Sequence, residues 1–166
     1  MNHRCPLRRS RSGFSLLEVA ISSILVGSIL VAALSTVGAV LRFRSATSDS
    51  GRAALLATDL LAEIQNLPYS DPNQTPVLGK ESGESTRVQF DDVDDYDSWT
   101  ETPPKNRAGT NLTGFTGWTR SVTVVRAQRN APMTNAGSDE GLKRIRITVS
   151  KNSVTLQTLD ALKASL

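Results

Sequence analysis

The hydrophobic pattern is dominated by one run of 23 residues, 19–41, that contains neither a charged residue nor a proline. At about 1.5 Å per residue, a helix of this length reaches about 34 Å, enough to cross a hydrocarbon core of about 30 Å. No second run of this kind follows in the sequence. The pattern therefore predicts one transmembrane segment at about 16–41, and it argues against both a purely soluble domain and a polytopic membrane protein.

Helical spacing of apolar residues continues beyond this run. Five positions recur three or four residues apart, which marks one face of an amphipathic helix: Ala53, Leu56, Leu60, Ile64 and Leu67. Pro68 follows, and proline ends a helix because it lacks the amide donor. We therefore expect one continuous helix over 14–66. The alternative is a membrane anchor, a linker near 45–51 and a separate second helix.

The pattern changes again after residue 67. Residues 67–117 are rich in glycine and proline and predict a long loop, with 86–90 as its one candidate strand. Residues alternate between apolar and polar in three later segments, which predict strands at 118–127, 144–149 and 154–159. A turn at Lys151-Asn152 would join the last two strands. The predicted fold class is α+β, with a long N-terminal helix packed on a small antiparallel sheet of three or four strands over 118–159.

Charge and composition narrow the chemistry of the chain. The net charge of the 166 residues is +3, but four arginines lie before residue 13, and the remaining chain has 15 basic against 16 acidic residues. The single cysteine, Cys5, and the single histidine, His3, lie in the same N-terminal segment. The rest of the chain therefore cannot form a disulfide, a thiolate metal cluster or a histidine-containing catalytic triad. We expect no catalytic residues and no enzyme.

The junction between the basic segment and the apolar run carries the most specific motif. Residues 13–19 read Gly-Phe-Ser-Leu-Leu-Glu-Val, so that Glu18 lies at the lipid end of the predicted transmembrane segment. A carboxylate in lipid is costly and calls for a partner or a function, although Glu18 at the headgroup interface is the simpler alternative. The order of basic segment, glycine, phenylalanine, glutamate and apolar helix resembles the N-terminal signal of type IV prepilins and type II secretion pseudopilins.

This resemblance implies a maturation pathway. Prepilin peptidase would cleave between Gly13 and Phe14 and remove residues 1–13 as a cytoplasmic leader. Phe14 would become the N-methylated terminus, and Glu18 would pair with the N-terminal ammonium of a neighbouring subunit during assembly. The resemblance further implies a pilin-like fold, with helix 14–66 anchored in the inner membrane and a periplasmic or extracellular head over 67–166.

Two departures from the family pattern favour a minor subunit. The apolar run lacks the helix-kinking proline of many major pilins, and the C-terminal region lacks their cysteine pair. The chain is more similar to the V-type minor pilin or the I-type minor pseudopilin. Its partners would then be prepilin peptidase, other pilin or pseudopilin subunits and the inner membrane. The alternative function is a membrane-tethered extracytoplasmic protein that binds DNA or an envelope partner and never assembles.

An acidic run is the most unusual feature of the predicted loop. Five carboxylates fall within seven residues: Asp91, Asp92, Asp94, Asp95 and Asp97. Their mutual repulsion would be relieved by a hard cation such as calcium, and some pseudopilins bind calcium in a head loop. The spacing is not that of an EF-hand, since the sixth position from Asp92 is not glycine. A contact surface for a basic partner and a solvated loop are the other two interpretations.

Basic and aromatic residues of the head allow competing interpretations. The predicted strands carry arginines and lysines from Arg120 to Lys151 that would form either a basic face for DNA or a solvated polar face. Aromatic residues do not alternate with these basic positions as a single-strand platform requires, so nucleic-acid binding is not expected. Most aromatics lie in the head, where we expect them to anchor the long loop onto the sheet.

Overall fold

The computed structural model describes residues 13–71 and 77–165. Residues 1–12 lie outside this range, so the leader expected at 1–13, together with Cys5 and His3, is not described except for Gly13. The chain divides into two compact units, Met1–Ser45 and Ala46–Leu166. We call the first the N-terminal unit and the second the head, and each is described separately.

One long helix, α1 (Leu16–Gln65), contributes to both units. Its first part holds an 18-residue window with a mean hydropathy of 2.4, of which nothing is buried. By length and composition, α1 is therefore able to cross a membrane. The helix ends one residue before the expected position, where the N–H groups of Asn66 and Leu67 bond the carbonyls of Glu63 and Ile64 just ahead of Pro68.

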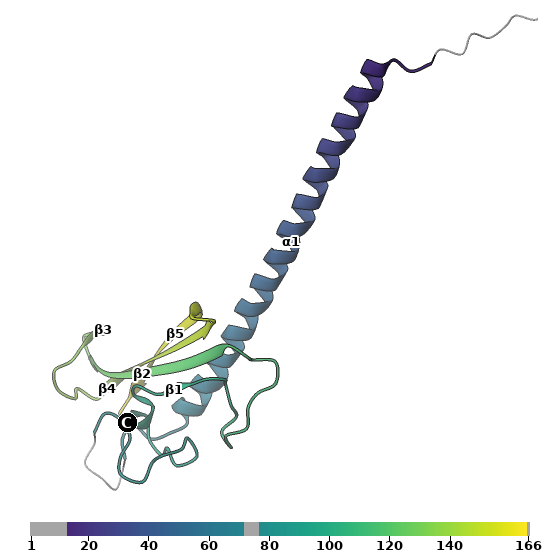
Figure 1. Cartoon of the computed structure of the whole chain (residues 1–166). Helices are drawn as coiled ribbons and strands as arrows, with labels where there is room; N and C mark the ends of the chain where they lie inside the picture. Colours follow the sequence, from purple (N-terminus) through teal and green to yellow (C-terminus); the bar gives the residue numbers. More distant parts are fainter. Residues whose placement is uncertain (1–12, 72–76, 166) are drawn as a thin grey trace, which may run out of the picture. The chain divides into compact units, whose positions relative to one another are not determined.

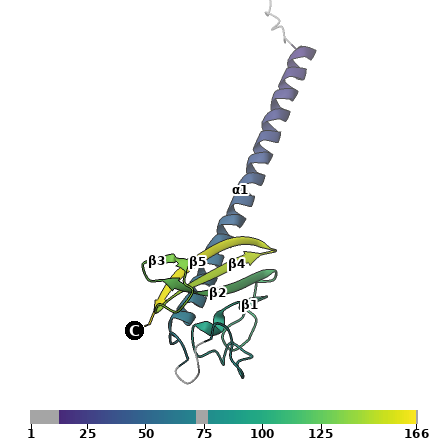
Figure 2. The ribbon, with the colours of Figure 1, turned by 90° about the vertical axis from the view of Figure 1, so that its left-hand side faces the viewer.

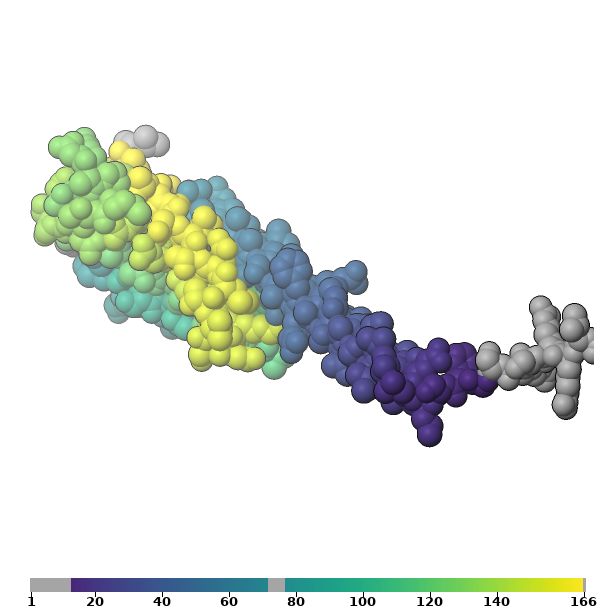
Figure 3. Space-filling view, turned by 90° about the horizontal axis from the view of Figure 1, so that it is seen from above, coloured from purple at the N-terminus to yellow at the C-terminus, as the bar shows by residue number. Residues whose placement is uncertain are grey.

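The head contains one five-stranded sheet, so the chain has the predicted α+β layout (Figure 1). The strands are β1 (Thr100–Glu101), β2 (Trp118–Gln128), β3 (Ala131–Asn135), β4 (Leu142–Lys151) and β5 (Val154–Ala164). Their order is β1-β2-β4-β5, with β3 paired to the end of β2, and all pairs are antiparallel. The space-filling view shows the C-terminal segment, in yellow, along the surface of the head (Figure 3).

The expected sheet was too small. β1 and β3 lie outside the three predicted strands, and β5 continues to Ala164 rather than ending at 159. The candidate strand at 86–90 is wrong, because these residues form a turn in which the side chain of Gln89 accepts hydrogen bonds from the N–H groups of Ser85 and Thr86. Side-chain capping of this kind competes with strand pairing.

One face of the sheet packs against the C-terminal turns of α1 within the head (Figure 2). The apolar helix positions Ala53, Leu56, Leu60 and Ile64 are all buried, as their spacing predicts. They meet the inward residues of two strands, which follow the expected alternation: Trp118, Val122, Val124, Ile145, Ile147 and Val149. Burial of these apolar side chains is the main force that joins helix and sheet.

The described parts of the long segment, 67–71 and 77–117, are folded onto this core rather than free of it. They contain a short 3-10 helix, η1 (Asp94–Tyr96), whose three residues are all buried. Phe90, Tyr96 and Trp99 pack edge to face, with ring centroids 5.0 and 5.8 Å apart. The aromatic residues thus anchor the segment to the sheet, as expected from the sequence.

Candidate functional site

The first candidate site is the start of α1 in the N-terminal unit. Gly13, Phe14 and Ser15 precede the helix, and the ring of Phe14 is 81% exposed. Ser15 caps the helix, because its hydroxyl accepts a hydrogen bond from the N–H of Leu17 at 3.3 Å and its carbonyl accepts one from Val19 at 3.1 Å. The residues on both sides of the expected cleavage position are therefore non-helical and exposed.

Glu18 lies in the first turn of α1. Phe14, Glu18, Ser22 and Val26 are spaced four residues apart and line one face, along a shallow groove. Ser15 and Glu18 also match the S-x-x-E capping box, a signal that the sequence analysis missed. A first-turn carboxylate is favoured by the helix dipole as well. The position of Glu18 in the first turn therefore favours the start of the helix, apart from the intermolecular role that the motif implies.

Hydroxyl groups within the apolar part of α1 are satisfied by the helix itself. The hydroxyls of Ser23, Ser28 and Ser35 donate to backbone carbonyls three or four residues earlier, at 2.7 to 2.8 Å. A polar side chain that is bonded in this way costs little in a medium without water. The serines are therefore compatible with a lipid environment and leave small surfaces for close approach of another helix.

The five carboxylates of the acidic run lie in different environments. Asp91 is exposed, whereas Asp92, Asp94 and Asp95 are buried. The interpretation of the run as a solvated loop is therefore wrong for these three residues. Asp94 pairs with Lys143, and Asp97 accepts a hydrogen bond from the N–H of Val124 at 3.0 Å. Burial raises the pKa of Asp92, Asp94 and Asp95. The five aspartates do not converge on one point in the way a single calcium loop requires.

Asp95 instead meets two glutamates that the sequence analysis did not consider. One carboxylate oxygen from each of Glu81, Glu84 and Asp95 lies within 4.8 Å of the other two. Burial, with the neighbouring carboxylate of Asp95, raises the pKa of Glu81 to about 8. These three residues are separated in sequence by 3 and 11 positions, so no local motif would have grouped them.

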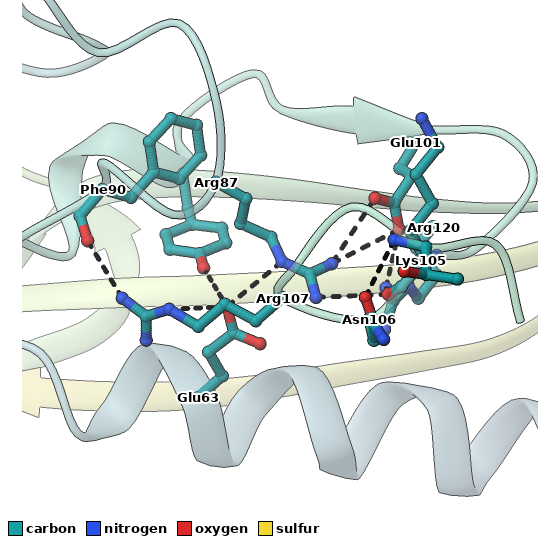
Figure 4. Close-up of polar contacts among 10 residues, drawn as sticks. Glu63, Arg87, Phe90, Glu101, Lys105, Asn106, Arg107 and Arg120 are labelled. Carbon is teal, nitrogen blue, oxygen red and sulfur yellow. Dashed lines mark hydrogen bonds and ion pairs between the residues drawn. The ribbon is translucent and has the colours of Figure 1, made fainter.

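A second polar cluster lies between the helix and the β1 edge of the sheet, and we call it the arginine network (Figure 4). Glu63 lies 3.1 Å from Nε of Arg87 and accepts a hydrogen bond from the Tyr96 hydroxyl at 2.7 Å. Oε2 of Glu101 lies 3.4 Å from Nη1 of Arg87 and 2.6 Å from Nη2 of Arg120. Arg107 is the most exposed charged member of the network: its Nε lies 4.0 Å from Glu63, and its side chain is 45% exposed.

The basic residues of the predicted strands lie partly inside the head. Arg120 and Lys143 lie on the core face of the sheet beside the apolar inward residues, and both are buried and paired. On the opposite face, Arg146 is exposed and pairs with Asp160 at 2.7 Å, and Arg129, just beyond the end of β2, is exposed as well. Neither the basic-face interpretation nor the solvated-face interpretation describes the two buried cations.

A hollow of about 450 Å³ borders the arginine network. Its lining includes Arg87, Trp99, Glu101, Lys105 and Arg107. The buried guanidinium groups already face Glu63, Glu101 and the Lys105 carbonyl, so their donors are directed into protein rather than toward a ligand. We interpret the network as a structural link between the loop, β1 and α1.

Comparison of the chain with protein-family models, with curated proteins and with solved structures gave no match. Functional inference therefore depends on the residues themselves. Of the expected site residues, Gly13, Phe14 and Glu18 lie together at the exposed start of α1, and the five aspartates are distributed between the surface and the core.

Proposed function

We propose that this chain is a prepilin-like structural subunit. Prepilin peptidase cleaves it between Gly13 and Phe14, the new terminus at Phe14 is methylated, and the mature subunit is held in the inner membrane by the apolar part of α1 with its head in the periplasm. From there it assembles into a type IV pilus or a type II secretion pseudopilus. The missing proline and cysteine pair favour a minor or tip subunit over a major one.

One observation carries the proposal: a carboxylate, Glu18, lies in the first turn of an exposed apolar helix, one turn after Phe14. In lipid or in a filament core, an unpaired carboxylate is costly. The ammonium that cleavage would create at Phe14 of a neighbouring subunit would compensate this charge and fix the axial register of two helices. The combination of glycine, phenylalanine and glutamate at these spacings is what this mechanism requires.

Assembly transfers α1 from lipid to a bundle of like helices. Lipid tails are as apolar as leucine, so burial alone gives little gain. The driving force comes from close packing at small residues and from the charge pair at Glu18. Gly27 and Gly38 with the internally bonded serines provide those small surfaces.

Mass spectrometry of the N-terminus in the native host tests the proposal. The expected product begins at a methylated Phe14, and Gly13→Leu is expected to retain the full N-terminal segment. An intact Met1 on the wild-type protein in the envelope would instead favour the tethered binding protein. The same measurement on a strain that lacks the peptidase provides the control.

A further inference from the structure

The arginine network contains more positive charge than its own carboxylates neutralise. Two partly buried carboxylates, Glu63 and Glu101, serve the whole network. Four basic residues surround them: Arg87, Lys105, Arg107 and Arg120. Four cations against two carboxylates leave an excess of two positive charges, and the structure shows which side chains carry this excess.

The carboxylate of Glu101 is already occupied by groups of the network. Its Oε2 accepts hydrogen bonds from Arg120 at 2.6 Å and from the backbone N–H of Lys105 at 2.7 Å, and Nη1 of Arg87 lies 3.4 Å away. Among the described residues, by contrast, no ion pair or hydrogen bond engages the ammonium of Lys105. The backbone of Lys105 is thus fixed in the network, whereas its charge is not neutralised there.

The guanidinium of Arg107 is held only loosely (Figure 4). Its Nε lies 4.0 Å from Oε1 of Glu63, which is outside hydrogen-bond distance, and that oxygen also faces Arg87 at 3.1 Å. Its Nη2 donates to the Phe90 carbonyl at 3.3 Å. A guanidinium carries five N–H donors, so most donors of Arg107 have no acceptor among the residues that the structure describes.

Both of these outer cations line the hollow of about 450 Å³, where Glu101 is the one acidic residue of the described lining. The volume falls within the range of about 300–1,000 Å³ that is typical of small-molecule sites. Lys105 and Arg107 flank Asn106, whose side chain accepts a hydrogen bond from the N–H of Thr110 at 2.9 Å. Because this turn is already ordered, binding of a ligand would cost little conformational freedom.

Hydroxyl groups contribute another polar part of the lining. Ser85 and Thr86 donate their hydroxyl protons to Oε1 of Gln89, at 3.1 and 2.9 Å, so the lone pairs of both hydroxyl oxygens remain as acceptors. Thr100 adds a third, exposed hydroxyl. A ligand that carries hydroxyl groups beside its negative charge fits this lining better than an apolar acid does.

We propose that the hollow binds a small acidic sugar, with Arg107 and Lys105 pairing with its carboxylate or phosphate group and the hydroxyl lining accepting its ring hydroxyls. Hydrogen bonds to an oxyanion from a charged donor are roughly twice as strong as neutral ones, and a guanidinium can make two of them in parallel. The proposal gives the head a recognition function beyond the proposed structural one. It is independent of filament assembly, because all the groups involved lie in the head.

Calorimetric titration of the purified full-length protein tests the site, in a detergent that has no sugar headgroup. The probes are glucuronate, glucose-6-phosphate, glucose and inorganic phosphate. We expect one molecule of at least one acidic sugar to bind per chain, about tenfold or more tightly than either glucose or inorganic phosphate. Binding of either acidic sugar supports the proposal, and the preference between the two identifies carboxylate or phosphate as the anionic group.

Substitutions assign the binding to the two outer cations. Arg107→Gln and Lys105→Gln are each expected to weaken binding about fivefold or more, because each removes one positive charge from the hollow. Arg129→Gln removes an exposed arginine that does not line the hollow, and it is expected to bind like the wild type. Without ligand, all three variants are expected to melt close to the wild-type temperature, since none of these charges is held in a buried pair.

The proposal is overturned if neither acidic sugar binds, if glucose or inorganic phosphate binds as tightly as the acidic sugars do, or if Arg107→Gln and Lys105→Gln bind like the wild type. If Arg107→Gln does not fold, Lys105→Gln alone decides, because this substitution leaves the backbone hydrogen bonds of residue 105 to the network in place.

Discussion

The ammonium of Lys143 lies 2.7 Å from Oδ2 of Asp94, and both side chains are 1% exposed. The pair joins β4 to η1 across 49 positions of sequence. Lys143 also donates to the Tyr69 carbonyl, so one buried cation holds the start of the long segment and its 3-10 helix against the sheet. A buried pair of this kind adds little net stability over an apolar pair, but removal of one partner leaves an uncompensated charge.

Lys143→Met is therefore expected to lower the free energy of unfolding by about 3–5 kcal/mol. The double variant Lys143→Met, Asp94→Leu removes both charges and is expected to recover a large part of this loss. Trp99 and Trp118 are buried and report unfolding by fluorescence during urea denaturation in detergent. Equal destabilisation by the single and double variants would show that the charge of Asp94 is not the cause.

The helix and the strands that have a periodic pattern of apolar residues could be predicted from the sequence. Leu56 and Leu60 repeat at helical spacing, and Val122 and Ile147 occur in alternating segments, so helix and strands followed from a local signal. β3 contains Pro132 and lacks alternation, and β1 is two residues long, so neither produced such a signal.

The cluster of Glu81, Glu84 and Asp95 could not be predicted from the sequence, for a physical reason. Five aspartates in a short run indicate solvent exposure, whereas three of them are buried, and the partner of Asp94 is Lys143, which is distant in sequence. Glu81 and Glu84 lie beside Asp95, but only the folded path of the loop brings them there. By contrast, Gly13, Phe14 and Glu18 belong to one short motif, so that a site there could be proposed from the sequence alone.

The pH dependence of stability is expected to report the protonation of the buried carboxyl groups around Glu81. The pKa of Glu81 is raised from its ordinary 4.5 to about 8, mainly by burial. Between these values, the folded protein keeps a proton that the unfolded chain has lost, so increasing pH favours unfolding. Burial raises the pKa of Asp92 and Asp95 as well, which acts in the same direction.

In EDTA, the melting temperature is thus expected to fall as the pH rises from 5 to 8, and Glu81→Gln is expected to flatten this slope. Asp139 and Asp160 do not contribute in this window, because their pKa values are lowered below the ordinary 3.8 and both stay ionised. Differential scanning calorimetry at matched ionic strength measures the effect. A wild-type melting temperature that is constant over this range would contradict the assigned burial of Glu81.

The turn between β4 and β5 offers a separate test of backbone strain. Asn152 and Ser153 form its two central positions with φ values of 49° and 67°, as in a type I′ turn. Asparagine tolerates this region, but serine is strained there by about 1–2 kcal/mol. Ser153→Gly relieves this strain and loses about 0.5–1 kcal/mol through greater freedom of the unfolded chain.

Ser153→Gly is therefore expected to raise the free energy of unfolding by about 0.5 kcal/mol. Gly117→Ala provides the opposite case at a residue that precedes β2 and contacts this turn, because Gly117 has a φ of +77° and a Cβ there would lie 2.3 Å from Oδ1 of Asn152. It is expected to destabilise the head. Urea denaturation of both variants checks the pair, and a destabilised Ser153→Gly would contradict the strain assigned to Ser153.

Glu18 has two candidate roles, one in helix capping and one in charge pairing with a neighbouring subunit, and replacing it by glutamine separates them. The capping-box pattern accepts glutamine in place of glutamate, because a side-chain amide oxygen is also an acceptor for the N–H of the N-cap residue, here Ser15. Glu18→Gln should therefore preserve the start of α1 while removing the charge that would pair with a neighbouring ammonium. Ser15→Ala has the reverse effect, since it removes the cap and keeps the carboxylate.

If charge pairing drives assembly, Glu18→Gln is expected to reduce incorporation into filaments as strongly as Glu18→Ala, by at least tenfold, while Ser15→Ala assembles nearly as well as the wild type. Quantitative immunoblots of sheared filaments and of membranes measure incorporation, and N-terminal mass spectrometry verifies that each variant is still processed at Phe14. Should Glu18→Gln assemble normally and Ser15→Ala fail, the carboxylate would act through helix capping alone. That result would remove the intermolecular pair from the mechanism while leaving cleavage and membrane anchoring untouched.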